Sequence, residues 1–144
     1  MEINNYMNII DSRDVIADIE ELETNIERIN DEIEELKLEE DPLNNEKIES
    51  IQDEIKDLQE ELDILTYLED QAEPYCSNWP YGEILIKDSY FSEYAEELAR
   101  DIGSISHDDS WPLNHIDWEE AVEELKSDYT QVDFDGEDYW IRSY

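Results

Sequence analysis

The feature that most constrains this chain is a pair of heptad seams in its first half. Between residues 12 and 40, apolar residues recur alternately four and three positions apart, and the same spacing returns from residue 48. This spacing places apolar side chains along one stripe of an α-helix. The first seam contains Val15, Ile19, Leu22, Ile26, Ile29, Ile33 and Leu36, and the second contains Ile48, Ile51, Ile55, Leu58, Leu62 and Leu65. Two long amphipathic helices are therefore predicted.

The connection between the seams predicts how the two helices pack. Residues 41–45 (DPLNN) contain a proline that breaks the first helix, and Asp41 or Asn45 is available to cap the second. Ser12 is expected to cap the first helix, and the second is expected to end within residues 66–71. Because the connection is short and each seam is narrow, the helices are predicted to form an antiparallel hairpin of about 42 Å, at roughly 28 residues each.

The sequence changes character after Glu73 and Pro74, where aromatic residues become frequent and the heptads stop. Residues 79–82 (WPYG) read as a turn. A helix is predicted over residues 88–101, with Gly103 placed to terminate it. Its apolar face contains Tyr90, Phe91, Tyr94, Ala95, Leu98 and Ile102.

The last part of the chain carries a capping signal and a hairpin signal. Asp117 and Glu120 have the spacing of a capping box, which predicts a helix to about residue 127. Residues 130–142 alternate apolar and polar side chains around Asp135-Gly136, which is a strong β-hairpin signal. The predicted fold class is therefore α+β. A coiled-coil helical hairpin (residues 1–73) precedes a small module with two helices and a C-terminal β-hairpin (residues 74–144).

Negative charge dominates the composition. The chain has 44 Asp and Glu residues against 9 Lys and Arg, and a formal net charge of -35. Residues 11–73 hold 25 acids and 5 bases, and residues 74–144 hold 18 acids and 4 bases. The 25 acids and 5 bases of residues 11–73 leave a net charge of -20 on the hairpin. Over a length of about 42 Å this is one net negative charge per roughly 2 Å, close to the spacing of about 1.7 Å per charge along duplex DNA. Since 39% of the residues are hydrophobic, the chain is nevertheless expected to fold.

The acids of the hairpin are not arranged for stability. A stabilised coiled coil pairs Glu with Lys along and across its helices, whereas this one surrounds each seam with like charge. Adaptation to molar salt also enriches acids, but the many Ile and Asn residues and the scarce Gly and Ala fit it poorly. Carboxylates on the hairpin and on the helix after Asp117 are therefore predicted to bind a partner. They are Glu20, Glu21, Glu23, Glu27, Asp31, Glu34, Glu35, Asp53, Asp57, Glu60, Glu61, Asp63, Glu119, Glu120, Glu123 and Glu124.

No residue pattern predicts catalysis, a cofactor or a metal ion. His107 and His115 lie near several aspartates but have no recognised ligand spacing. A calcium loop that includes Asp133 and Asp135 would begin at Gln131 and end at Arg142, which is not a ligand set. With three glycines in the chain, tight phosphate-binding turns are scarce. The chain is not expected to be an enzyme.

Partners and location follow from the same composition. Trp79, Trp111, Trp118 and Trp140 are expected to pack within the C-terminal module, because the net charge would repel a nucleic acid. The single cysteine, Cys76, favours a reducing compartment and therefore the cytoplasm. The sequence shows no signal peptide and no membrane span, and binding to membranes is not expected.

Four stretches of the C-terminal half carry a resemblance to known proteins. They are residues 81–91 (YGEILIKDSYF), 116–121 (IDWEEA), 128–130 (DYT) and 139–142 (YWIR). They resemble small acidic proteins encoded by phages and mobile elements. They are also similar to the C-terminal part of ArdA-type antirestriction proteins, in which an acidic helix precedes a short terminal strand. The resemblance implies an anti-defence role, in the host cytoplasm if a phage encodes the protein.

Charge and resemblance together predict a nucleic-acid mimic. The carboxylates would occupy the basic DNA- or RNA-binding groove of a host restriction or CRISPR-type protein, without direct binding to nucleic acid. The alternative is an interaction adaptor or inhibitor whose hairpin docks on a partner helix or forms a homodimer. A further alternative is a chaperone of histone-like or other basic proteins.

Overall fold

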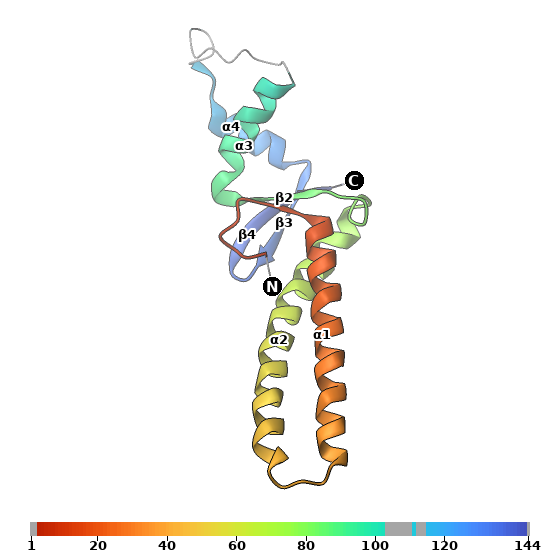
Figure 1. Cartoon of the computed structure of the whole chain (residues 1–144). Coiled ribbons are helices and arrows are strands. Elements are labelled where there is room, and N and C mark those ends of the chain that lie inside the picture. The colour runs from red at the N-terminus through yellow and green to blue at the C-terminus, as the bar shows by residue number, and fades with distance from the viewer. Residues whose placement is uncertain (1–2, 103–110, 112–114, 144) are drawn as a thin grey trace.

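The structure, a computed structural model, describes residues 3–102, 111 and 115–143. A helical hairpin projects from one side of a small sheet, and two further helices lie on the other side (Figure 1). The hairpin consists of α1 (Ser12–Leu38) and α2 (Asn44–Ala72), with 27 and 29 residues. The predicted α+β fold, with its long antiparallel hairpin, two further helices and C-terminal β-hairpin, is confirmed.

The sheet has four antiparallel strands in the order β1-β2-β4-β3. They are β1 (Ile9–Asp11), β2 (Ile84–Lys87), β3 (Tyr129–Phe134) and β4 (Glu137–Arg142). Asp135 and Gly136 connect β3 to β4, with φ angles of 50° and 87°. Positive φ at both positions is the requirement of the tight turn predicted from the Asp-Gly pair. The C-terminal hairpin is therefore as expected, but the sequence did not predict β1 or β2.

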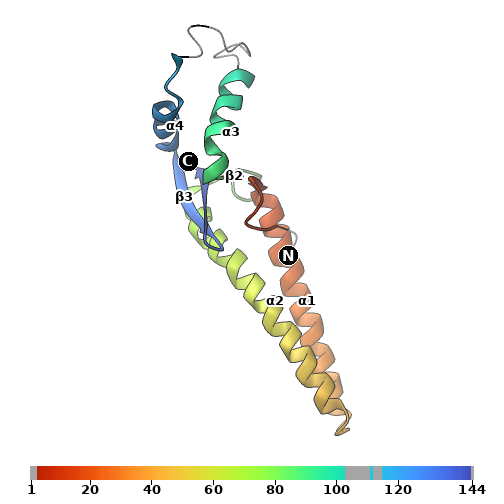
Figure 2. The ribbon, with the colours of Figure 1, turned by 90° about the vertical axis from the view of Figure 1, so that its left-hand side faces the viewer.

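Both faces of the sheet are covered by helices. On one face Leu85, Tyr139 and Ile141 pack with Leu65 and Leu68 of α2 in the larger hydrophobic core. On the other face Ile86 forms a second core with residues of α3 (Asp88–Asp101) and α4 (Trp118–Lys126), among them Phe91, Ala95 and Val122. Figure 2 shows α3 and α4 side by side beyond the sheet. The sheet is thus the middle of three layers.

Two hydrogen-bond systems tie the hairpin to the sheet. The Ser12 hydroxyl donates to the Trp79 carbonyl and accepts from the Glu83 amide, each at 2.8 Å. The Gln71 side chain donates to the carbonyl of Asp133 at 2.9 Å and accepts from its amide at 2.8 Å. Asp133 lies on β3, which is an edge strand. The side-chain amide of Gln71 therefore takes the place of a neighbouring strand at this point.

The ends of the helices differ in detail from the predictions. Ser12 was expected to cap α1, but Ser12 is fully buried and bonded to Trp79 and Glu83, whereas Asp11 is the capping residue and accepts from the Arg13 amide. The cap of α4 by Asp117, which accepts from the Glu120 amide at 3.2 Å, is confirmed. Gly103, the expected end of α3, lies outside the described residues.

The expected boundary between residues 73 and 74 falls within shared structure. A short 3₁₀ helix (Glu73–Tyr75) follows α2 directly, and the larger core combines residues from both sides of the boundary. Strand β1, which precedes α1, pairs with β2. The base of the hairpin and the sheet therefore pack together, while the rest of the hairpin extends away from the sheet (Figure 1).

Candidate acidic interaction surface

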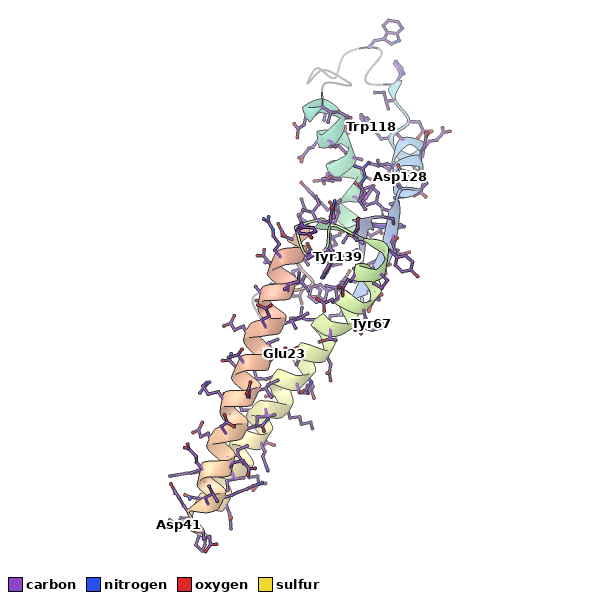
Figure 3. All side chains as sticks on the ribbon, turned by 90° about the vertical axis from the view of Figure 1, so that its right-hand side faces the viewer. Glu23, Asp41, Tyr67, Trp118, Asp128 and Tyr139 are labelled. Carbon is purple, nitrogen blue, oxygen red and sulfur yellow. The ribbon has the colours of Figure 1, made fainter. Side chains whose placement is uncertain are left out.

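The carboxylates predicted to bind a partner lie almost entirely on the surface. All of them are exposed except Glu61, which is half-buried and has an interaction partner. Heptad spacing is the reason, because it turns the remaining positions of each helix away from the seam. Figure 3 shows side chains projecting along the whole hairpin, with Glu23 labelled near its middle and Asp41 at its far end.

Five of the predicted acids form one stripe on α1. Glu20, Glu23, Glu27, Asp31 and Glu34 follow one another at intervals of three, four, four and three residues. Residues at these intervals lie above one another on a helix. At 1.5 Å per residue this row, here called the α1 stripe, is about 21 Å long.

A second stripe with the same intervals runs along α2. It consists of Glu46, Glu49, Asp53, Asp57 and Glu60, and all five residues are exposed. Three of them were predicted to bind a partner, but Glu46 and Glu49 were missed. The spacing that defines the α2 stripe was available in the sequence and would have found them.

The other predicted residues lie elsewhere. By helical spacing, Glu21 falls on another face of α1 than the stripe, whereas Glu35 lies four residues after Asp31 and Asp63 three residues after Glu60, next to the two stripes. The four acids of α4 are Glu119, Glu120, Glu123 and Glu124. Figure 1 shows that α4 and the hairpin lie on opposite sides of the sheet. The structure therefore does not bring the acids of α4 together with those of the hairpin.

Few of these charges are compensated. Among the described residues, Lys37 contacts Glu34 of the α1 stripe at 3.9 Å, and Lys126 contacts Glu123 of α4 at 3.5 Å. Arg28 lines a shallow hollow together with Glu27, Asp31, Glu32 and Glu35. Glu34 and Glu123 are exposed, and ion pairs to such exposed carboxylates contribute little to stability. The stripes therefore remain strongly negative and accessible.

The sheet end uses its acids differently. The Asp88 carboxylate accepts from the Trp140 indole at 2.8 Å and from Lys126 at 3.2 Å, and these bonds lower the pKa of Asp88. Glu69 accepts from the Trp79 indole at 3.2 Å, and burial raises the pKa of this carboxyl. Here individual carboxylates have specific partners, whereas the stripes present carboxylates to solvent.

Other candidate sites receive little support from the described residues. His115 is exposed, and His107 lies outside the described part of the chain. Among the residues that the structure describes, no three His, Cys, Asp or Glu side chains gather as metal ligands would. Nor is any described helix long and apolar enough to cross a bilayer. Trp79 is buried as expected, but the expectation that Trp111 packs within the module is wrong, because its side chain is 76% exposed.

No family model, no curated protein and no solved structure matches the chain. The resemblance to ArdA-type antirestriction proteins stays a prediction.

Proposed function

We propose that this protein is a nucleic-acid mimic that inhibits a basic nucleic-acid-binding protein of a host defence system. The observation that carries the proposal is the pair of exposed stripes on one hairpin, each with five carboxylates at helical spacing. A partner with a groove lined by Lys and Arg would find in these stripes a substitute for rows of phosphates.

The physical basis is complementary charge. Carboxylates in a fixed row attract the Lys and Arg side chains of the partner, speed the encounter and displace the counterions or nucleic acid held there. The two stripes together present ten carboxylates over about 21 Å of hairpin, or roughly one per 2 Å. This density is close to that of the duplex, at about 1.7 Å per charge.

The fold supports the proposal through access. The hairpin projects from the sheet as a narrow rod, with its far end well away from the termini and from α3 and α4 (Figures 1 and 2). Such a rod can enter a groove without interference from the rest of the molecule. Like-charge neighbours along a stripe cost a few tenths of a kcal/mol each, a cost that stability alone does not explain.

Charge reversal on the stripes tests the proposal. Glu27, Asp31, Asp53 and Asp57 are replaced by Lys, and the matched control reverses four exposed acids of the sheet end, Glu93, Asp101, Asp128 and Asp138. Both variants carry the same net charge. Binding to partners captured from a host lysate is measured at low and high salt, with duplex DNA and with RNA as competitors.

The expected result is that the stripe variant loses its partners and the control retains them, that binding weakens steeply with salt, and that nucleic acid competes. Equal loss in both variants would indicate bulk charge and favour a general chaperone of basic proteins. Binding that is unchanged by salt and by stripe reversal would contradict the mimic. It would favour an adaptor that docks through apolar contacts.

A further inference from the structure

The connection between α1 and α2 exposes large apolar side chains. Every residue from 38 to 43 is exposed, and Leu38 and Leu43 are 82% and 80% exposed. Scattered exposed leucines are common on proteins, but these two flank one short turn at the far end of the hairpin (Figure 1). This end therefore offers an apolar feature within an otherwise acidic surface.

The seam next to this turn is incompletely covered. Ile29 and Ile33 of α1 are buried, whereas Ile48, Ile51 and Ile55 of α2 are only half-buried. Half-buried Leu36 lines two hollows. The larger, of approximately 450 Å³, also includes Ile51, Glu32, Glu46, Lys47 and Ser50, and the smaller, of approximately 290 Å³, also includes Ile48 and residues of the turn. The larger hollow is thus lined by two apolar side chains and two carboxylates, together with Lys47 and Ser50.

Side-chain hydrogen bonds link the turn to both helix ends. Buried Asn44 donates to the Leu36 carbonyl at 3.2 Å and to the Glu39 carboxylate at 2.9 Å, which joins the two helix ends. The Asp41 carboxylate accepts from the Leu43 amide at 2.9 Å. A feature that is already ordered loses little conformational entropy when it binds.

Charge indicates what could cover this end. Residues 32–49 contain eight acids and two bases. A second copy of the chain would bring the same negative charge against it, and a nucleic acid or an anionic membrane would also be repelled. A cationic partner with an apolar face satisfies both the charge and the exposed leucines.

We infer that the distal surface, defined by the exposed Leu38 and Leu43 at the two ends of the turn, binds an amphipathic basic helix of the partner. Apolar residues of that helix seat against the two leucines, while its Lys and Arg side chains pair with exposed carboxylates of the turn such as Glu40. Amphipathic helices are commonly recognised through a few such apolar anchors. The inference rests on the proposed function, and it adds a salt-resistant contact at the end of the salt-sensitive stripes.

The test uses the full chain and a defined probe. The probe is a dye-labelled Leu/Lys peptide that forms an amphipathic helix, and the control is a peptide of the same composition in scrambled order. Binding is measured by fluorescence anisotropy at about 0.5 M NaCl, where the Debye length falls to roughly 4 Å and exposed charge attraction is weak. The chain variants are Leu38→Ser/Leu43→Ser and, as a matched control at the sheet end, Tyr75→Ser/Tyr81→Ser, all at exposed positions.

We expect the amphipathic peptide to bind the native chain about tenfold more tightly than the scrambled peptide at this salt, a difference of about 1.4 kcal/mol. Leu38→Ser/Leu43→Ser should abolish the difference, and Tyr75→Ser/Tyr81→Ser should preserve it. Equal binding of both peptides, or no effect of the leucine substitutions, would overturn the inference. So would sedimentation equilibrium showing that the native chain dimerises through these leucines.

Failure of this inference can be told apart from failure of the proposed function. The stripe reversals at Glu27, Asp31, Asp53 and Asp57 leave the distal leucines in place. If these reversals abolish capture of the natural partner but the leucine substitutions do not change peptide binding, the inferred distal contact is wrong and the proposed nucleic-acid mimicry is retained. If the leucine substitutions matter and the reversals do not, the mimic is wrong.

Discussion

The two ends of this molecule use their sequence in opposite ways. At the sheet end, helices cover both faces of the sheet, and carboxylates such as Asp88 and Glu69 accept hydrogen bonds from specific tryptophans. In the distal hairpin, a narrow seam is the main apolar contact, and the carboxylates face solvent. The sheet end is therefore expected to provide the stability that allows the hairpin to carry a repulsive charge.

The strongest test of this comparison is a matched pair of leucine truncations. Leu85 is fully buried between β1 and β4, whereas Leu36 is half-buried in the distal seam. Leu85→Ala should lower the free energy of unfolding by about 3 to 4 kcal/mol, and Leu36→Ala by about 1 kcal/mol. Urea unfolding followed by circular dichroism measures both. Equal losses would show that the hairpin contributes as much stability as the sheet end.

A second test removes one paired carboxylate from the sheet end. Asp88→Ala deletes the acceptor of the Trp140 indole and of Lys126, so the free energy of unfolding should fall by about 1.5 kcal/mol. Asp88→Asn retains an acceptor for the indole and should recover part of the loss. Because the pKa of Asp88 is lowered in the folded state, its contribution is present above the ordinary aspartate pKa of about 3.9 and is lost as pH falls through the lowered value.

The difference between native and Asp88→Ala protein should therefore stay constant from about pH 7 to pH 5 and narrow only below about pH 4. Urea unfolding at several pH values measures this difference. A difference that is already shrinking near neutral pH would show that another group carries the effect.

Removing charge from a stripe should raise the free energy of unfolding, whereas the substitutions at Leu85, Leu36 and Asp88 should lower it. Glu23→Gln/Glu27→Gln/Asp31→Asn eliminates like-charge neighbours on the α1 stripe, and at low salt it should raise the free energy of unfolding by about 1 kcal/mol. Added salt should reduce the gain, since screening weakens the repulsion in the native chain. Destabilisation by this substitution would mean that the stripe carboxylates have stabilising partners, and it would remove the contrast between the ends.

The smallest expected effect concerns the hairpin turn. Glu40 has a φ of 52°, in the left-handed region that glycine adopts without a steric penalty. Glu40→Gly should raise the free energy of unfolding by about 0.5 kcal/mol, because relief of strain exceeds the added flexibility of the unfolded chain. Thermal unfolding by calorimetry measures this gain. Glu40→Ala, which keeps the Cβ atom, is the control. It relieves no backbone strain and should therefore not raise the free energy of unfolding in this way.

The sequence predicted the helices far better than the sheet. Heptad spacing predicted the positions of α1 and α2 accurately, because one periodic signal extends over many residues. Strand β1 has three residues, and β2 begins with three consecutive apolar residues before Lys87, with Leu85 in one core and Ile86 in the other. Neither shows an alternating pattern, and their pairing is a long-range contact that no local signal contains.

The candidate surface was predictable for the same reason as the helices. Helical periodicity turns the stripe carboxylates outward, so their exposure follows from the seam. The role of Ser12 was not predictable, because its hydroxyl binds Trp79 and Glu83 about seventy residues later in the chain. The exposure of Leu38 and Leu43 likewise depends on how closely the helix ends approach in three dimensions.

The bond between Gln71 and the edge strand has a consequence for solubility. An open strand edge is a template for aggregation, and in this chain strong mutual repulsion between molecules opposes such pairing near neutral pH. That repulsion disappears close to the isoelectric point that the sequence gives, at about pH 4.1. The amide of Gln71 is neutral and occupies both the donor and the acceptor of Asp133 at any pH. It therefore blocks part of this edge under acidic conditions, when charge no longer keeps the molecules apart.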